Sequence, residues 1–186
     1  MTANDRVADE LSLTPESFWS LYKAEIKEKG PWNAFKGRRS WTPFAVAAAE
    51  CVCRKFGFHT GREYFKVDVC AWTGTDYDYD LRVAFENEND PTWEDELCRL
   101  SHIISDLRVL VAYQSNQKRP AEETLDQLLL RHEHRIRRDC NCKWLFIFGP
   151  HYMNRSGCWA AYKLDESWKR IQLIDELPLL GIHMRD

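Results

Sequence analysis

The stretch from Leu81 to Tyr113 reads LRVAFENENDPTWEDELCRLSHIISDLRVLVAY and decides the expected fold. It begins with alternating apolar residues and ends in LRVLVAY, a run rich in apolar and β-branched residues that is typical of a buried strand. Between these ends, apolar residues recur at helical spacing, at Trp93, Leu97, Leu100 and Ile104. A strand, a helix and a strand joined by such short links form a βαβ crossover, so we expect the two strands to be parallel.

The residues before this stretch predict an antiparallel hairpin and two helices. The segment REYFKVDVCAW, residues 62–72, alternates like a single strand, and TGTDYDYD, residues 73–80, has the composition of a turn. Proline near the first helical position and glycine after the last one bound helices over residues 14–29 and 43–57.

The residues after this stretch extend the pattern. We expect a helix over residues 120–138, which is acidic at its start and basic at its end, as the helix dipole favours. KWLFIFG, residues 143–149, and WAAYKLD, residues 159–165, predict a second hairpin. Proline and glycine interrupt residues 173–186, so we expect that segment to lie across one face. The whole order predicts an α/β fold with a mixed central sheet flanked by helices.

Composition excludes several classes of protein. The chain has 186 residues, 44% of them hydrophobic and 13% aromatic, enough to bury a core, and its net charge of -3 argues against a general nucleic-acid coat. No apolar run approaches the roughly 20 residues that a membrane span needs. The polar, acidic beginning predicts no secretory leader, and seven cysteines in such a chain predict free thiols. We therefore expect a cytoplasmic protein with no membrane association.

Acidic residues occupy unusual positions around the predicted hairpin. Asp68 lies inside an otherwise strand-like segment, where acids are disfavoured. Glu86 and Glu88 are two residues apart on the next strand, so they point to the same face. If the two strands pair, Asp68 and Glu86 become cross-strand neighbours whose repulsion a divalent cation such as Mg²⁺ or Mn²⁺ would relieve. Glu50 is a further acid, within the preceding alanine-rich helix.

This order of elements and acids resembles the PD-(D/E)XK nuclease superfamily, which has the restriction-endonuclease-like fold, over residues 42–113. The resemblance implies that Asp68, Glu86 and the carbonyl of Asn87 are metal ligands. It also implies that Glu50 is the acid of the first core helix. The expected activity is Mg²⁺- or Mn²⁺-dependent hydrolysis of phosphodiester bonds in nucleic acid.

The sequence departs from the pattern of that superfamily in three ways. Val67 precedes Asp68 where the motif has a proline, and one strand fewer than expected precedes Asp68, unless residues 56–65 contain a short one. Glu88 stands where the (D/E)-x-K tripeptide has its lysine, so we expect Glu88 to assist and another residue to supply the positive charge. Lys66, two residues before Asp68, is our candidate for this role, and Arg99 on the following helix is a second one; either could instead be a counter-ion for the acids. The alternative function is a catalytically inactive module of the same fold that serves in binding or regulation. A third possibility is a surface rich in tryptophan that binds a protein partner.

We expect one domain over residues 1–186. It would comprise an N-terminal helix and basic linker over residues 1–41, a nuclease-like core over residues 42–113, and a C-terminal extension over residues 114–186. The basic, aromatic linker suits contacts to phosphates and bases, although a solvated loop is the commoner outcome.

Two features near the acids and the cysteines have simpler explanations. Asp90 is expected to cap the helix that follows it. Cys140 and Cys142 lie among histidines that could bind zinc, but their spacing is not that of a usual zinc site, so reduced thiols are favoured.

Overall fold

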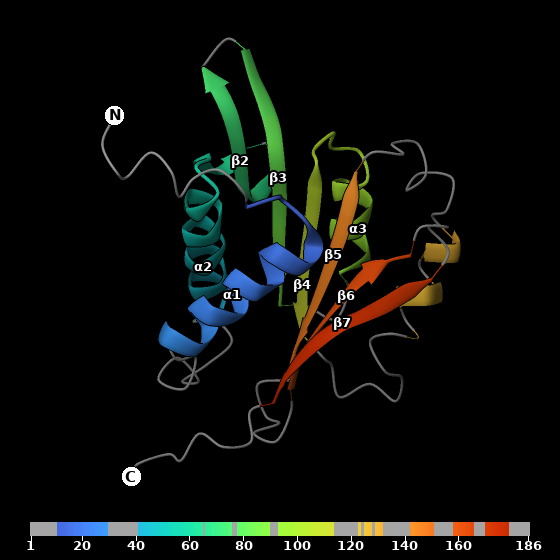
Figure 1. The fold of residues 1–186 in the computed structure, drawn as a ribbon. Helices are drawn as coiled ribbons and strands as arrows, with labels where there is room; N and C mark the ends of the chain where they lie inside the picture. Colours follow the sequence, from blue (N-terminus) through green and yellow to red (C-terminus); the bar gives the residue numbers. More distant parts are fainter. Residues whose placement is uncertain are drawn as a thin grey trace.

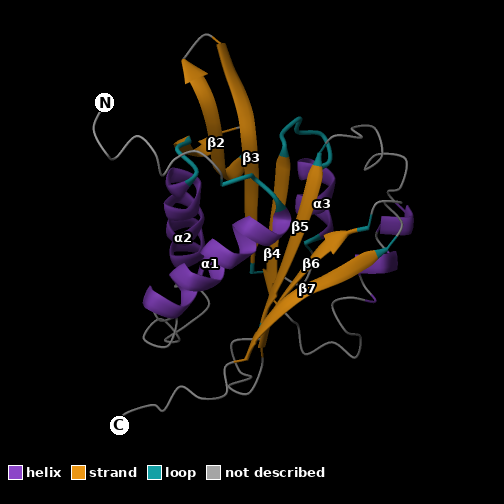
Figure 2. Cartoon of the chain, in the orientation of Figure 1, coloured by secondary structure: helices purple, strands orange, loops and turns teal. Residues whose placement is uncertain are grey.

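The structure, a computed structural model, describes a large part of the chain. The described residues are 11–29, 41–64, 66–75, 78–89, 93–113, 123, 125–127, 129–131, 142–150, 158–165 and 170–178. They form an α/β fold in which helices cover both faces of a seven-stranded mixed sheet (Figures 1 and 2). None of the helices described is long and apolar enough to span a membrane.

The seven strands follow one another across the sheet in the order of the sequence. They are β1 (His59–Tyr64), β2 (Val67–Thr75), β3 (Asp78–Glu88), β4 (Leu107–Tyr113), β5 (Lys143–Gly149), β6 (Cys158–Leu164) and β7 (Ile171–Pro178). The strands from β3 to β5 are parallel, and the strands on either side of them pair antiparallel. The predicted hairpins β2–β3 and β5–β6 and the predicted parallel pairing of β3 with β4 are therefore confirmed.

The helices divide between the two faces of the sheet. Helices α1 (Pro15–Lys29) and α2 (Trp41–Lys55) pack on one face (Figure 1). Helix α3 (Glu94–Leu100) connects β3 to β4 and packs on the other face, together with Leu125 and Leu129 from helical residues before β5. The connection from β3 to β4 and the connection from β4 to β5 each join parallel strands. Such crossovers are right-handed, so they place their helices on the same face of the sheet.

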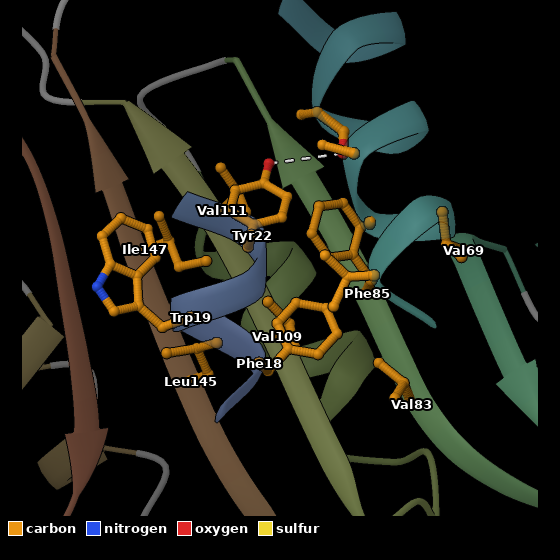
Figure 3. Close-up of a cluster of buried hydrophobic side chains, with 14 of the residues drawn as sticks. Phe18, Trp19, Tyr22, Val69, Val83, Phe85, Val109, Val111, Leu145 and Ile147 are labelled. Carbon is orange, nitrogen blue, oxygen red and sulfur yellow. Dashed lines mark hydrogen bonds between the residues drawn. The ribbon is translucent and has the colours of Figure 1, made fainter. Parts of the chain in front are cut away.

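Two hydrophobic clusters hold these layers together. In the first, Phe18, Trp19 and Tyr22 from α1 pack on strand residues such as Phe85 and Ile147 (Figure 3). In the second, the α3 side chains pack against a different set of strand residues. The strand residues of this cluster include Cys70, Ala84, Leu110, Trp144 and Phe146. Strands β4 and β5 are buried on both faces, which explains why their sequences are almost continuously apolar.

The structure corrects several predicted boundaries before α3 and within it. The predicted single strand over residues 62–72 is two strands, because the backbone turns at Lys66, whose φ is 61°. Strand β2 continues to Thr75 and β3 already begins at Asp78, so most of the predicted turn belongs to the hairpin strands. Helix α3 ends at Leu100, which leaves Ile104 80% exposed instead of buried.

The C-terminal prediction was also wrong in part. The segment expected to lie across a face contributes β7, which pairs antiparallel with β6 along its length. Its proline, Pro178, is the last residue of an edge strand, where the missing N–H removes no hydrogen bond from the interior of the sheet.

Candidate functional site

A cleft of about 350 Å³ opens where the β1–β2 turn, the end of β3 and helix α3 meet. Its lining includes five carboxylate side chains and two cationic ones. The lining residues are Glu63, Lys66, Val67, Asp68, Glu86, Asn87, Glu88, Glu96 and Arg99. The cleft therefore has an excess of acidic groups, on a chain that is only slightly acidic overall.

The side chains of Asp68 and Glu86 each accept a hydrogen bond from the backbone of the other residue's strand. The backbone N–H of Asp68 donates to Oε2 of Glu86 at 3.3 Å. The backbone N–H of Asn87 donates to Oδ2 of Asp68 at 2.8 Å. The register of the hairpin, in which Val69 pairs with Phe85, leads directly to this arrangement. The predicted proximity of Asp68 and Glu86 is thus confirmed, because each carboxylate accepts a backbone N–H from the other's strand.

Burial makes both carboxylates difficult to ionise. Glu86 is only 3% exposed, and loss of hydration raises its pKa to about 7, even though Arg99 stabilises the charged form. The charge of Asp68 adds to this increase. Burial likewise raises the pKa of Asp68, with further contributions from the charges of Glu88 and Glu63. Two neighbouring acids in this state form a site that favours a cation or a proton.

Arg99 is the cation in contact with this pair. Its Nη1 lies 2.7 Å from Oε1 of Glu86 and donates a second hydrogen bond to the carbonyl of Lys66 at 3.1 Å. Its Nη2 lies 3.5 Å from Oε1 of Glu96, one turn earlier in α3. Sequence reasoning identified Arg99 as a possible counter-ion, and the structure places it in that role.

Lys66 and Glu88 also border the cleft. The position of Lys66 in the fold differs from the one expected. Lys66 lies in the β1–β2 turn instead of on a strand, so its side chain is not fixed by strand alternation with Asp68. Glu63, the next-to-last residue of β1, also has a positive φ, of 53°. Such a backbone is strained for residues other than glycine, and it brings both residues to the rim. Glu88 follows Glu86 at the same parity, is partly exposed, and also lines the cleft.

Asn87 is held in place on the side of the sheet opposite the carboxylates. Its Oδ1 accepts a hydrogen bond from the hydroxyl of Tyr113 at 2.7 Å. Its side-chain amide donates to Oγ1 of Thr42 at 3.2 Å, and Asn89 also donates to Thr42. Tyr113 and Thr42 were not identified from the sequence, because no local pattern indicates contacts between residues so distant along the chain. They fix the strand end that presents its N–H to Asp68.

Glu50 is the one predicted site residue that the structure places away from the cleft. Its two carboxylate oxygens accept hydrogen bonds from the guanidinium of Arg62 at 2.7 and 2.8 Å. This bidentate ion pair joins α2 to β1 and lowers the pKa of Glu50. The helical acid therefore has a structural partner, and we no longer assign it to the site.

Three further predictions fall wholly or partly outside the described residues. Asp90, the basic linker up to residue 40, and Cys140 lie outside them. Cys142 is described, and its buried thiol lies 3.5 Å from the carbonyl of Lys143. Among the described residues, no group of three or more histidine, cysteine or acidic side chains is arranged as a metal cage.

The carboxylate pair nevertheless suits one kind of metal ion. Mg²⁺ usually retains several waters and binds through one or two carboxylates together with substrate phosphate, without a cage made entirely of protein ligands. Asp68 and Glu86 supply two adjacent oxygen donors in a cleft large enough for such a hydrated ion.

No protein-family model matches the sequence, and no curated protein matches it. The function must therefore be argued from the geometry of the cleft.

Proposed function

We propose that this protein is a metal-dependent nuclease-like hydrolase that cleaves phosphodiester bonds in nucleic acid, with Asp68 and Glu86 as its metal ligands. The observation that carries the proposal is the pair itself. Asp68 is partly buried and Glu86 is buried, and the two carboxylates come from neighbouring strands and line the same open acidic cleft. Burial raises the pKa of each. The restriction-endonuclease-like core, residues 42–113, belongs to the same proposal.

The residues around the pair suit phosphodiester hydrolysis. Mg²⁺ or Mn²⁺, when bound, would supply positive charge for the transition state and a more acidic water. Asp68 is oriented by the N–H of Asn87, and Glu86 by the N–H of Asp68. Lys66 is an exposed cation at the rim, where the phosphate of a substrate would enter. The backbone carbonyl of Asn87 remains the proposed third ligand.

The acidic character of the cleft limits how nucleic acid can bind. Phosphates are repelled by an excess of carboxylates, so the proposed substrate would bind only together with divalent cations. Glu88 and Glu96 lie close enough to Asp68 and Arg99 to add to this negative field. We therefore expect cleavage and substrate binding to share the same dependence on Mg²⁺ or Mn²⁺.

The direct test is a cleavage assay on single-stranded and duplex DNA and RNA with Mg²⁺ or Mn²⁺. The wild-type protein should cleave at least one of these substrates, and Asp68→Asn should lose about 100-fold or more in rate because a ligand charge is removed. Asp106→Asn is the matched control, since Asp106 forms an ion pair with Arg82 instead of lining the cleft. Cleavage that survives unchanged in Asp68→Asn would sink the assignment.

A specific observation favours the second candidate, an inactive binding or regulatory module. Glu88 occupies the position of the motif lysine, and the cleft residue Arg99 is engaged in an ion pair with Glu86. Under this alternative, divalent cations would bind at the pair and promote nucleic-acid or protein binding without cleavage of any substrate in the assay.

A further inference from the structure

Both carboxylate oxygens of Glu86 already have donors from the chain. Oε2 accepts the backbone N–H of Asp68 at 3.3 Å, and Oε1 accepts Nη1 of Arg99 at 2.7 Å. A divalent cation that coordinates Glu86 must therefore share or displace one of these donors. The outcome depends on which donor can leave at the lower cost.

The two donors differ in mobility. The N–H of Asp68 belongs to β2, so it can withdraw only if the hairpin opens. The guanidinium of Arg99 is at the end of a long side chain that is 38% exposed, whereas the side chain of Glu86 is 4% exposed. Arg99 also has a second carboxylate within reach, because Oε1 of Glu96 lies 3.5 Å from its Nη2. Arg99 is therefore the donor that can move.

The charges of these groups also favour Arg99 as the donor that moves. A buried carboxylate needs a counter-charge, and among the described residues the guanidinium of Arg99 is the cationic group in hydrogen-bond contact with Glu86. A divalent cation would take over that role and would repel a guanidinium only a few Å away. The guanidinium of Arg99 and a bound cation would thus compete for the same atom, Oε1 of Glu86.

We propose that Arg99 is an internal competitor that sets the affinity of the carboxylate pair for divalent cations. Binding of the cation at Glu86 transfers the guanidinium from Oε1 of Glu86 towards Glu96. The transfer also breaks the hydrogen bond from Nη1 to the carbonyl of Lys66, which ties α3 to the β1–β2 turn. This inference rests on the proposed function only in requiring that the pair binds a divalent cation.

The test is a calorimetric titration of the full chain with Mn²⁺, without nucleic acid. Arg99→Gln should bind Mn²⁺ about tenfold or more tightly than the wild type, because a repelling unit charge has been removed. Arg62→Gln is the matched control: it also removes an arginine from an ion pair with a glutamate, but outside the cleft, and its Mn²⁺ affinity should stay near the wild-type value. Arg99→Lys retains the charge and should bind Mn²⁺ within about threefold of the wild type.

Each result decides a separate claim. Equal or weaker Mn²⁺ binding by folded Arg99→Gln would overturn the competition and leave the metal site standing. An equal gain in Arg62→Gln would show a general charge effect and would also overturn it. If Arg99→Gln does not fold, Arg99→Lys alone still tests the inference, since a loss or gain well beyond threefold contradicts it. Absence of Mn²⁺ binding in the wild type and in every variant would overturn the metal site and the competition together.

Discussion

At the scale of single residues, the candidate site is a pair of carboxyl groups, Asp68 and Glu86, whose burial disfavours the ionised form. Each carboxylate gains a backbone N–H from the neighbouring strand, yet burial still raises both pKa values. The hydrogen bonds fix the positions of the oxygens without removing the cost of their charge. Such a site is pre-organised for a ligand that brings positive charge with it.

The raised pKa of Glu86 predicts how stability depends on pH. The pKa is about 7 in the folded protein and 4.5 in an unperturbed glutamate, so the folded state holds the proton more tightly. The free energy of unfolding of the metal-free protein should therefore fall as pH rises from about 5 to 8, by roughly 3 kcal/mol from this residue. Denaturant unfolding at several pH values measures this dependence.

Glu86→Gln provides the comparison, because a glutamine cannot ionise. Its free energy of unfolding should change less with pH over the same interval, although the raised pKa of Asp68 leaves a smaller dependence of the same sign. Parallel curves for the wild type and Glu86→Gln would show that Glu86 does not titrate in this range.

Glu50 gives a prediction that separates a structural acid from a site acid. Glu50→Gln should lower the free energy of unfolding only slightly, because it weakens a bidentate ion pair whose arginine, Arg62, is exposed to solvent. Mn²⁺ affinity should be unchanged. A clear loss of Mn²⁺ affinity in Glu50→Gln would return this acid to the site.

The sequence allowed the centre of the site to be predicted, but not its surroundings. Strand parity and the order of elements are local properties, and they brought Asp68 and Glu86 together correctly. The role of Glu50 depended on Arg62, whose strand was not separated from β2 in the prediction. The contacts of Asn87 with Tyr113 and Thr42 depend on tertiary packing, which no local pattern reports.

At the scale of elements, the β1–β2 turn, the end of β3 and helix α3 define the cleft. Lys66 in this turn and Glu63 near the end of β1 lie at the rim with positive φ values, and neither is a glycine or a proline. Turn signals rely on those residue types, so no local pattern marks the break between β1 and β2, and the sequence only leaves open a short strand within residues 56–65. The helical and strand patterns that were longer or more regular, such as α1, β4 and β5, were predicted well.

The end of β5 offers a test of how rigidly this region is packed. A Cβ at Gly149 would lie 2.7 Å from the ring of Tyr113 and 2.9 Å from that of Trp159. The ring of Tyr113 cannot move away freely, because its hydroxyl donates a hydrogen bond to Oδ1 of Asn87. Gly149→Ala should therefore lower the free energy of unfolding by about 1–3 kcal/mol, as measured by denaturant titration.

Gly61→Ala is the matched control for that variant. Its Cβ would lie 3.1 Å from the edge of the Trp72 ring, a milder contact with a side chain that is only partly buried. The loss of stability should be smaller than for Gly149→Ala. The opposite ranking would mean that the region around Tyr113 is more adaptable than its contacts indicate.

At the scale of the whole molecule, one sheet joins the candidate site to the rest of the fold. Three central parallel strands carry antiparallel strands at both sides, and the cleft lies at the end of β3, where the antiparallel and parallel parts meet. The central parallel pairing could be predicted from a short helical connection. The edge strand β7 could not, because a segment containing Pro178 does not read as part of a continuous strand.

The central claim is that Asp68 and Glu86 bind a divalent cation. The most direct measurement is the anomalous diffraction of crystals of the protein soaked in MnCl₂. We predict an anomalous peak within about 2.5 Å of carboxylate oxygens from both Asp68 and Glu86, with Arg99 moved away from Glu86. Data of good quality with no peak between these carboxylates, and with Arg99 still bound to Glu86, would contradict the account.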